Sequence, residues 1–194
     1  MLKNKDITAI ILAGGQSSRM GSDKGLTMFN NKPFIQHIID VVRPMCREII
    51  IVSSNLAYDV FECTRQADII TNVGPLGGIH SGLKHSTTNV NLIISCDVPM
   101  ISKAVIEQLY LGYSEDYEVI QTMVDNKSMP LVALYHKSCI SPLENWLAND
   151  KRRVREFVGS LRLKTVTIAK EQRHDLLNIN SPQQLKKIAH AIGD

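Results

Sequence analysis

Short runs of β-branched and apolar residues alternate along this chain with longer stretches of helical periodicity, and this alternation limits the folds open to it. The runs that we expect to form strands are Ile7–Leu12, Ile49–Ser53, Asp68–Thr71 and Asn91–Ser95. Three of them are almost wholly apolar, as is typical of parallel strands covered on both faces. Strands that alternate with helices imply βαβ units and a mostly parallel sheet.

The helices expected around these strands complete one α/β domain. Pro33 stands at a plausible first helical position ahead of residues 34–43, and Ser102 is a candidate N-cap for a helix over Ser102–Leu111. The runs Glu118–Val124 and Leu131–Tyr135 flank the turn-rich Asp125-Asn126-Lys127 and predict a hairpin-like pair near the sheet edge. Further helices are expected at Lys137–Ala148, Arg153–Leu161 and Pro182–Ile192, with a strand at Lys164–Ile168. We therefore expect a three-layer, Rossmann-like α/β domain that spans residues 1–194.

Composition excludes several classes of protein. With 44% hydrophobic and 21% charged residues, the chain has the content of an ordinary globular protein. No apolar stretch approaches the roughly 20 residues that a membrane span needs, so no membrane partner is expected. A net charge of +3 does not demand a nucleic-acid partner, but it suits a protein that handles small anions. None of the four cysteines forms a CxxC pair, so we expect free thiols in a cytoplasmic protein.

A glycine-rich segment, residues 12–25, directly follows the first expected strand. Ligands of open parallel sheets bind at the carboxyl ends of the strands, where this segment lies. Its paired glycines, Gly14 and Gly15, would let backbone N–H groups approach a phosphate or a base closely. Arg19 could hold phosphate oxygens with a bidentate fork, and Lys24 with a point charge. Neither a Walker A loop nor a GxGxxG fingerprint is present.

Three further motifs lie at expected strand or helix ends. Gly74-Pro75-Leu76-Gly77-Gly78-Ile79 is a loop that enters a helix. Asp97 closes the fourth strand and could hold Mg²⁺, which needs only one or two carboxylates beside substrate phosphates; capping of the next helix is the alternative. Asn178 and Asn180 precede the last helix and would face the same side of an extended segment, with packing as the alternative role.

These motifs together resemble the molybdenum cofactor nucleotidyltransferases over nearly the whole chain. Residues 12–25 are similar to the LAGGxSxRMGxDKG signature of that family, and a second glycine directly after Gly14 resembles its guanylyltransferase branch. The GPLxGI, CDxP and NxN elements match at Gly74, Asp97 and Asn178. The last element departs slightly, because Ser181 replaces a threonine and two glutamines replace an acidic pair. The basic cluster Lys151–Arg155 is similar to an RRV element, although such runs are often only solvated.

The resemblance implies a Mg²⁺-dependent transfer of GMP from GTP to molybdopterin. It assigns catalytic roles to Arg19, Lys24 and Asp97, with Asp97 as the metal ligand. The nucleotide-binding residues that it implies are Leu12, Ala13, Gly14, Gly15, Lys24, Ser53, Asn72, Gly74, Gly78 and Asp97, of which Ser53 and Asn72 stand where the family often has asparagine and aspartate. The acceptor-binding residues that it implies are Asn178, Asn180, Arg153 and Arg155. It also implies transient contacts with other cofactor-biosynthesis proteins and with the molybdoenzymes that receive the product.

Three alternative functions stay open on the sequence. A molybdopterin cytidylyltransferase would differ mainly in its choice of base. A sugar-phosphate nucleotidyltransferase would carry sugar-binding residues in the middle of the chain. A non-catalytic protein would bind GTP and release no pyrophosphate, and the presence of Lys24 and Asp97 argues against it.

Overall fold

A seven-stranded sheet forms the centre of the molecule in a computed structural model, which describes residues 2–3, 6–14 and 23–186. The strand order is β5-β4-β1-β6-β8-β7-β9, and every pairing is parallel except those that β8 makes with β6 and β7. The strands are β1 (Ile7–Leu12), β4 (Glu48–Val52), β5 (Thr64–Gln66), β6 (Val90–Ser95), β7 (Val119–Val124), β8 (Lys127–His136) and β9 (Leu163–Thr167). The predicted mostly parallel sheet is confirmed.

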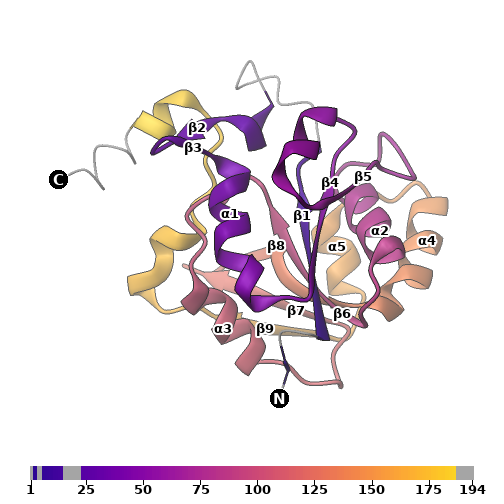
Figure 1. The fold of residues 1–194 in the computed structure, drawn as a ribbon. Helices are drawn as coiled ribbons and strands as arrows, with labels where there is room; N and C mark the ends of the chain where they lie inside the picture. Colours follow the sequence, from indigo (N-terminus) through magenta and orange to yellow (C-terminus); the bar gives the residue numbers. More distant parts are fainter. Residues whose placement is uncertain (1, 4–5, 15–22, 187–194) are drawn as a thin grey trace.

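Helices cover both faces of this sheet (Figure 1). On one face lie α1 (Phe34–Val42) and α3 (Lys103–Leu111); on the other lie α2 (Pro75–His85), α4 (Ile140–Ala148) and α5 (Val154–Gly159). Alternate residues of β1 enter the two resulting cores: Ile11 packs in the first and Ile10 in the second. Because both faces are covered, all six residues of β1 are buried, and the three-layer prediction is confirmed.

Two features of the sheet differ from the sequence prediction. The segment Asp68–Thr71 is a loop, not a strand; its Ile69 is 53% exposed, and the third parallel strand is the shorter and more polar β5. The expected hairpin forms through a tight turn in which Asp125 and Asn126 both have positive φ. Neither of its strands is at the sheet edge, because β8 lies between β6 and β7, and β9 adds in parallel outside β7.

The predicted helix starts hold within a few residues. Ser102 caps α3 by accepting a hydrogen bond from the Val105 N–H. Pro33 is the residue before α1; it belongs to the two-stranded ribbon of β2 (Met28–Phe29) and β3 (Lys32–Pro33). The stretch predicted as helix from Lys137 begins as a 3-10 turn, η5 (Lys137–Cys139), before α4.

Short 3-10 helices, none of them predicted, connect the main elements. They are η2 (Lys24–Leu26), η3 (Arg43–Met45), η4 (Leu56–Phe61) and η6 (Lys170–Leu176), in addition to η5. A glycine permits the close approach of α2 to β1, since a Cβ at Gly82 would lie 2.3 Å from Cγ2 of Ile10. Helix α2 therefore fits tightly over the strand that leads into the glycine-rich segment.

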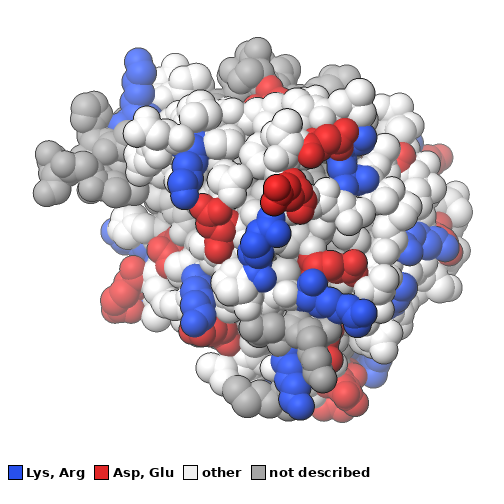
Figure 2. Space-filling view, viewed as in Figure 1, with Lys and Arg blue, Asp and Glu red and all other residues white. Residues whose placement is uncertain are grey.

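The surface carries charges of both signs. In the space-filling view, basic and acidic side chains are interspersed over the visible face (Figure 2), in keeping with the small net charge of +3. Within the described ranges, no helix is long and apolar enough to cross a membrane.

Candidate functional site

The candidate site lies at the carboxyl ends of the parallel strands. Backbone hydrogen bonds hold the ends of β1, β4 and β6 together: Ala13 N–H donates to the Val52 carbonyl at 3.0 Å, and Cys96 N–H to the Leu12 carbonyl at 3.0 Å. Leu12 and Ala13 are buried by this arrangement, and the chain emerges from the sheet at Gly14. The predicted residues Gly15 and Arg19 lie outside the described residues.

Gly14 and Gly78 flank the carboxylate of Asp68. A Cβ at Gly14 would lie 3.6 Å from Oδ2 of Asp68, and a Cβ at Gly78 would lie 3.6 Å from Oδ1. A Cβ at Gly78 would also meet the Leu12 side chain at 3.0 Å, so glycine at this position leaves the region beside Asp68 free of a side chain. Gly74, at the N-cap of α2, has a positive φ of 64°, which turns the loop into the helix.

Asp68 is a polar group with an unfilled hydrogen-bonding capacity. Its Oδ1 is buried, and among the described residues it has no hydrogen-bond partner. Burial raises the pKa of this carboxyl above its ordinary value. Buried polar atoms are nearly always paired, so an unpaired carboxylate oxygen at a strand end is a candidate partner for a ligand or an ordered water.

Sequence reasoning missed Asp68 and singled out Asn72 in its place. It took Asp68 as the first residue of a strand, whereas this residue follows β5 at the carboxyl edge of the sheet. Asn72 is exposed, with φ 62°, and its carbonyl accepts a hydrogen bond from Arg152 at 2.9 Å. The sequence did contain a signal that could have identified Asp68: it is a carboxylate that lies six residues before the glycine motif at Gly74.

Lys24, Asp97 and Asn180 meet on the other side of Gly14. The ammonium Nζ of Lys24 donates to Oδ1 of Asn180 at 2.6 Å and lies 3.7 Å from Oδ2 of Asp97. Both charged side chains are 18% exposed, so they are accessible yet shielded from bulk water. Ile179 N–H donates to the Asp97 carbonyl at 2.9 Å, which ties the Asn178–Asn180 segment to the end of β6. Asp97 therefore lies at the strand end where its motif was expected, and the Asn178–Asn180 segment lies next to it.

A pocket of about 490 Å³ opens beside Asp97, on the side away from Asp68 along the sheet order. Its walls are mostly apolar and come from β8, from the start of α5 and from the ends of the β6 and Asn178 segments. They comprise Ser95, Asp97, Val98, Ser128, Met129, Pro130, Leu131, Val132, Arg153, Val154, Arg155, Glu156 and Asn178.

The two arginines at this pocket differ in how they are held. Arg153 pairs with Glu156 at 2.7 Å while its side chain stays 81% exposed. Arg155 reaches the Ser128 carbonyl at 3.4 Å. The predicted acceptor residues Arg153, Arg155 and Asn178 thus line one pocket, whereas Asn180 contacts Lys24.

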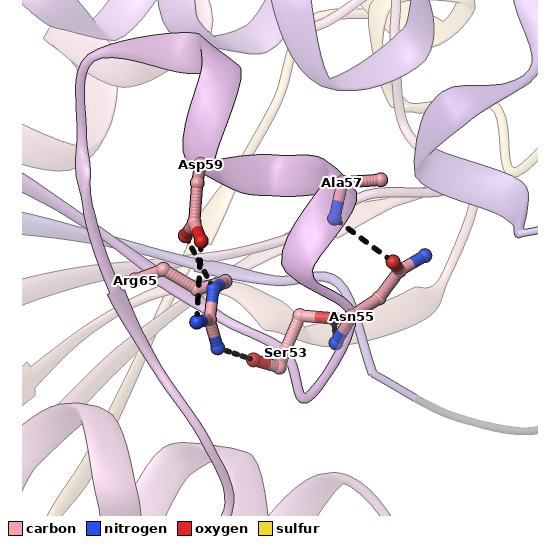
Figure 3. Close-up of polar contacts among 5 residues, drawn as sticks. All are labelled: Ser53, Asn55, Ala57, Asp59 and Arg65. Carbon is pink, nitrogen blue, oxygen red and sulfur yellow. Dashed lines mark hydrogen bonds and ion pairs between the residues drawn. The ribbon is translucent and has the colours of Figure 1, made fainter.

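Ser53 directly follows β4, at the same carboxyl edge of the sheet. It is 3% exposed, its hydroxyl accepts from the Asn55 N–H at 3.2 Å, and its carbonyl accepts from Arg65 at 3.2 Å (Figure 3). Through these bonds Ser53 helps to hold the start of η4 against the end of β4.

The described residues contain no cluster of three or more histidine, cysteine or acidic side chains that could enclose a metal ion. Asp97 still fits a hard divalent cation, because it offers carboxylate oxygen at the mouth of the site next to a lysine suited to phosphate. An ion there would need substrate phosphates and water to complete its shell, which is how Mg²⁺ is usually bound.

Fold and site together define an α/β nucleotidyltransferase: a glycine turn, a lysine and a lone carboxylate stand at the strand ends beside a second, partly apolar pocket. The chain belongs to the family described as MobA-like NTP transferase domain, whose model matches residues 9–166.

Individual relatives agree with that family. The chain is 33% identical over 182 residues to a probable molybdenum cofactor guanylyltransferase of Flavobacterium johnsoniae, with 94% of this chain and 96% of the relative covered. It is 34% identical over 191 residues to a probable molybdenum cofactor guanylyltransferase of Clostridium perfringens, with 93% and 95% covered. The solved structure of molybdopterin-guanine dinucleotide biosynthesis protein A from Archaeoglobus fulgidus superposes with a TM-score of 0.81 at 22% identity, covering 96% of this chain and 98% of that one. This last likeness establishes the nucleotidyltransferase fold.

Proposed function

We propose that this protein transfers GMP from GTP to the phosphate of molybdopterin, forming molybdopterin guanine dinucleotide and pyrophosphate. One observation carries the proposal: Lys24 and Asp97 stand between a narrow niche at Asp68 and a pocket lined by Arg153 and Arg155. A transferase needs such an arrangement, with one substrate on each side of the reacting phosphorus. The names of the relatives supply the identity of the two substrates.

The niche at Asp68 is suited to guanine. The Watson–Crick edge of guanine presents two adjacent N–H donors, from the ring and from the 2-amino group, and a carboxylate can accept both. Cytosine offers one donor beside a ring acceptor, so one carboxylate oxygen would face a lone pair. We assign base recognition to Asp68, with Leu12, Ala13, Gly14 and Gly15 framing the ring. A site built to pair with specific donors rejects ligands that lack them.

Lys24 and Arg19 would neutralise the triphosphate, and Asp97 would hold Mg²⁺. Bound there, Mg²⁺ would supply positive charge that offsets the negative charge of the reacting phosphates. Asn180 and Asp97 hold Lys24 in place. Such preorganised charge is usually the largest contribution to catalysis of this kind.

The transfer step needs no general base. An oxygen of the molybdopterin phosphate, already ionised at neutral pH, attacks the α-phosphorus of GTP. A new P–O–P bond forms, the bond from the α-phosphorus to its bridging oxygen breaks, and pyrophosphate leaves with that electron pair. The chain's residues orient the two phosphates and screen their repulsion.

The pocket beside Asp97 would take the acceptor. Its apolar walls suit the flat pterin, Asn178 can hydrogen-bond to the ring, and Arg153 and Arg155 can hold the phosphate. Among the described residues, the one hydrogen bond of the Arg155 side chain is to the Ser128 carbonyl at 3.4 Å, so it can turn toward an anion at little cost.

Replacement of both arginines by alanine tests the acceptor assignment. We expect a higher KM for molybdopterin, weaker salt dependence and an unchanged KM for GTP. Arg162→Ala is the matched control, because Arg162 is also exposed but pairs with Glu118 near the start of β9. If neither KM changes, or if only the KM for GTP changes, the two arginines do not bind the acceptor.

Competition between GTP and CTP in one reaction separates the guanylyltransferase from the cytidylyltransferase alternative. We expect guanine to predominate in the product, because Asp68 pairs with both guanine donors. Equal incorporation would favour the cytidylyltransferase reading, and transfer to a sugar phosphate would favour a sugar-phosphate nucleotidyltransferase.

We further propose that residues 1–194 act as one nucleotidyltransferase domain, because a single sheet connects both halves of the site. We place the reaction in the cytoplasm, since Cys46, Cys63, Cys96 and Cys139 are all free thiols. The product would then pass to molybdoenzymes through transient contacts.

A further inference from the structure

The carboxylate of Asp23, next to Lys24, accepts hydrogen bonds from two side chains of another element. Its Oδ2 accepts from Nδ2 of Asn55 at 2.9 Å, and its Oδ1 accepts from the Tyr58 hydroxyl. Oδ1 also accepts from the Gly25 N–H at 3.1 Å, which caps η2. Tyr58 is fully buried, and burial together with Asp23 raises the pKa of its phenol, so the hydroxyl remains a donor.

The element that supplies these donors, η4, is itself held in place. Asn55 caps it by accepting from the Ala57 N–H at 3.0 Å (Figure 3). Arg65, from β5, binds Asp59 of η4 at 2.5 Å and the Ser53 carbonyl at 3.2 Å. These bonds fix η4 to the ends of β4 and β5, so Asn55 and Tyr58 present their donors from a rigid support.

Gly25, on the other side of Lys24 in the sequence, also packs against Tyr58. A Cβ there would lie 2.3 Å from Oη of Tyr58 and 3.2 Å from its ring, so only glycine lets η2 lie against the buried tyrosine. Asp23 and Gly25 thus enclose the hydroxyl of Tyr58, while Lys24 between them points toward Asp97 and Asn180.

The three-residue η2 is too short to hold this position alone. Its backbone is closed by bonds of 3.2 Å from Leu26 to Asp23 and 3.1 Å from Thr27 to Lys24. Such short 3-10 turns have weak hydrogen-bond geometry and depend on their surroundings. A side chain with four rotatable bonds, such as that of Lys24, needs a fixed base if its charge is to meet one phosphate oxygen.

We propose that Tyr58 and Asn55 are positioning residues, which place the Lys24 ammonium at the reacting phosphates by clamping Asp23. This inference rests on the proposed nucleotidyl transfer for its catalytic consequence, but the clamp itself is a property of the free protein. Each residue of Asp23-Lys24-Gly25 then has a distinct role. Asp23 binds the side chains of Asn55 and Tyr58, Lys24 binds phosphate, and Gly25 leaves space for the Tyr58 ring.

An exchange of side chains tests the clamp without loss of the cap on η4. In Asn55→Asp, one carboxylate oxygen can still cap the Ala57 N–H, but the other faces Asp23 and repels it. In the double variant Asp23→Asn/Asn55→Asp, the amide and the carboxylate have changed places, and the hydrogen bond between them can form again. Tyr58→Phe removes the other donor and keeps the ring. Tyr110→Phe is its control, because Tyr110 of α3 donates to the Met45 carbonyl of η3 at 3.0 Å rather than to Asp23.

We expect Asn55→Asp and Tyr58→Phe each to lower kcat for GMP transfer by about 10- to 100-fold, since small misplacement of a catalytic group has effects of this size. KM for GTP should change much less. The exchange variant should regain most of the lost kcat, and Tyr110→Phe should match the wild type. Variants that keep wild-type kcat, or an exchange variant no better than Asn55→Asp, would overturn the proposal.

Acylation of lysines in the free protein, followed by mass spectrometry, provides a readout that does not depend on the reaction. Lys24 should become more reactive in Asn55→Asp and return toward the wild-type rate in the exchange variant. The exposed Lys103 serves as the internal standard. If Lys24 reactivity changes in Asn55→Asp but the wild-type protein transfers no GMP, the clamp is upheld and the proposed reaction is refuted. If Lys24 reactivity is the same in Asn55→Asp as in the wild type, and the wild type transfers GMP normally, the clamp alone is refuted.

Discussion

Gly25→Ala should destabilise the protein through a clash that the structure locates at one atom. The new Cβ would lie 2.3 Å from Oη of Tyr58. An ordinary contact begins near 3.4 Å, so the overlap is about 1.1 Å (3.4 − 2.3). Tyr58 is fully buried and its ring is rigid, so the strain cannot be relieved at the surface. Overpacking of this kind costs about 1–3 kcal/mol.

A double-mutant cycle isolates the clash from other effects of the alanine. Tyr58→Phe alone should cost about 1.5–3 kcal/mol, because it removes a buried hydrogen bond to a carboxylate. In the double variant the oxygen is gone and the nearest ring atom lies at 3.2 Å, which needs only a small adjustment. Urea denaturation should therefore show that the double variant loses less stability than the sum of the single variants, by about 0.5–3 kcal/mol. Strict additivity, or an alanine variant as stable as the wild type, would refute the packing of Gly25 on Tyr58.

Other residues of the site and the framework yield further predictions. Lys24→Ala should lower kcat/KM by about 10²–10³-fold with a smaller effect on unfolding, and an unchanged kcat/KM would remove it from catalysis. Asp97→Asn should raise the Mg²⁺ concentration for half-maximal rate; an unshifted titration would point to a structural role. Asp68→Asn should reduce the preference for GTP over CTP by about 10- to 100-fold, measured by competition, whereas a constant ratio would exclude it from base recognition.

A final prediction concerns stability against pH at Glu48, at the opposite end of the sheet. Burial raises the pKa of Glu48, but hydrogen bonds from Thr87 and Thr8 outweigh it and lower the pKa below its usual 4.5. The stability that it contributes is therefore complete above about pH 4.5 and disappears as the pH falls through the folded-state pKa. Glu48→Gln should lose about 1 kcal/mol at pH 7, since the group is only partly buried, and less than that at pH 3. Equal losses at both pH values would contradict the charged hydrogen bonds.

The sequence predicted those parts of the fold that depend on long apolar runs. β1 and β6 were found because both faces of each are buried, which leaves a continuous apolar signal. β5 was missed because this three-residue edge strand is polar and half-exposed. The β-branched Ile69 and Ile70 in the following loop imitated a strand, since periodicity cannot distinguish a short apolar loop from a short strand.

The site was predictable where residues lie next to strand ends in the sequence, as Gly14 and Asp97 do. The missing parts depend on tertiary contacts. Asp68 acquires its position only when α2 packs over β5 and brings Gly78 to it. Asn55 and Tyr58 lie more than 30 residues from Asp23, and no local pattern connects a 3-10 helix with a distant aspartate. The pairing of Asn180 with Lys24 likewise joins the two ends of the chain.

The central claim is GMP transfer from GTP to molybdopterin. It is tested most directly with GTP that carries radioactive phosphorus at the α position. The wild-type protein would be incubated with this GTP, Mg²⁺ and molybdopterin, and the products separated and identified by mass. We predict that the label appears in molybdopterin guanine dinucleotide, with one pyrophosphate released per labelled molecule and no transfer when molybdopterin is left out. GTP that binds and is recovered intact would contradict the account, and so would label that reaches molybdopterin only when α-labelled CTP is supplied in place of GTP.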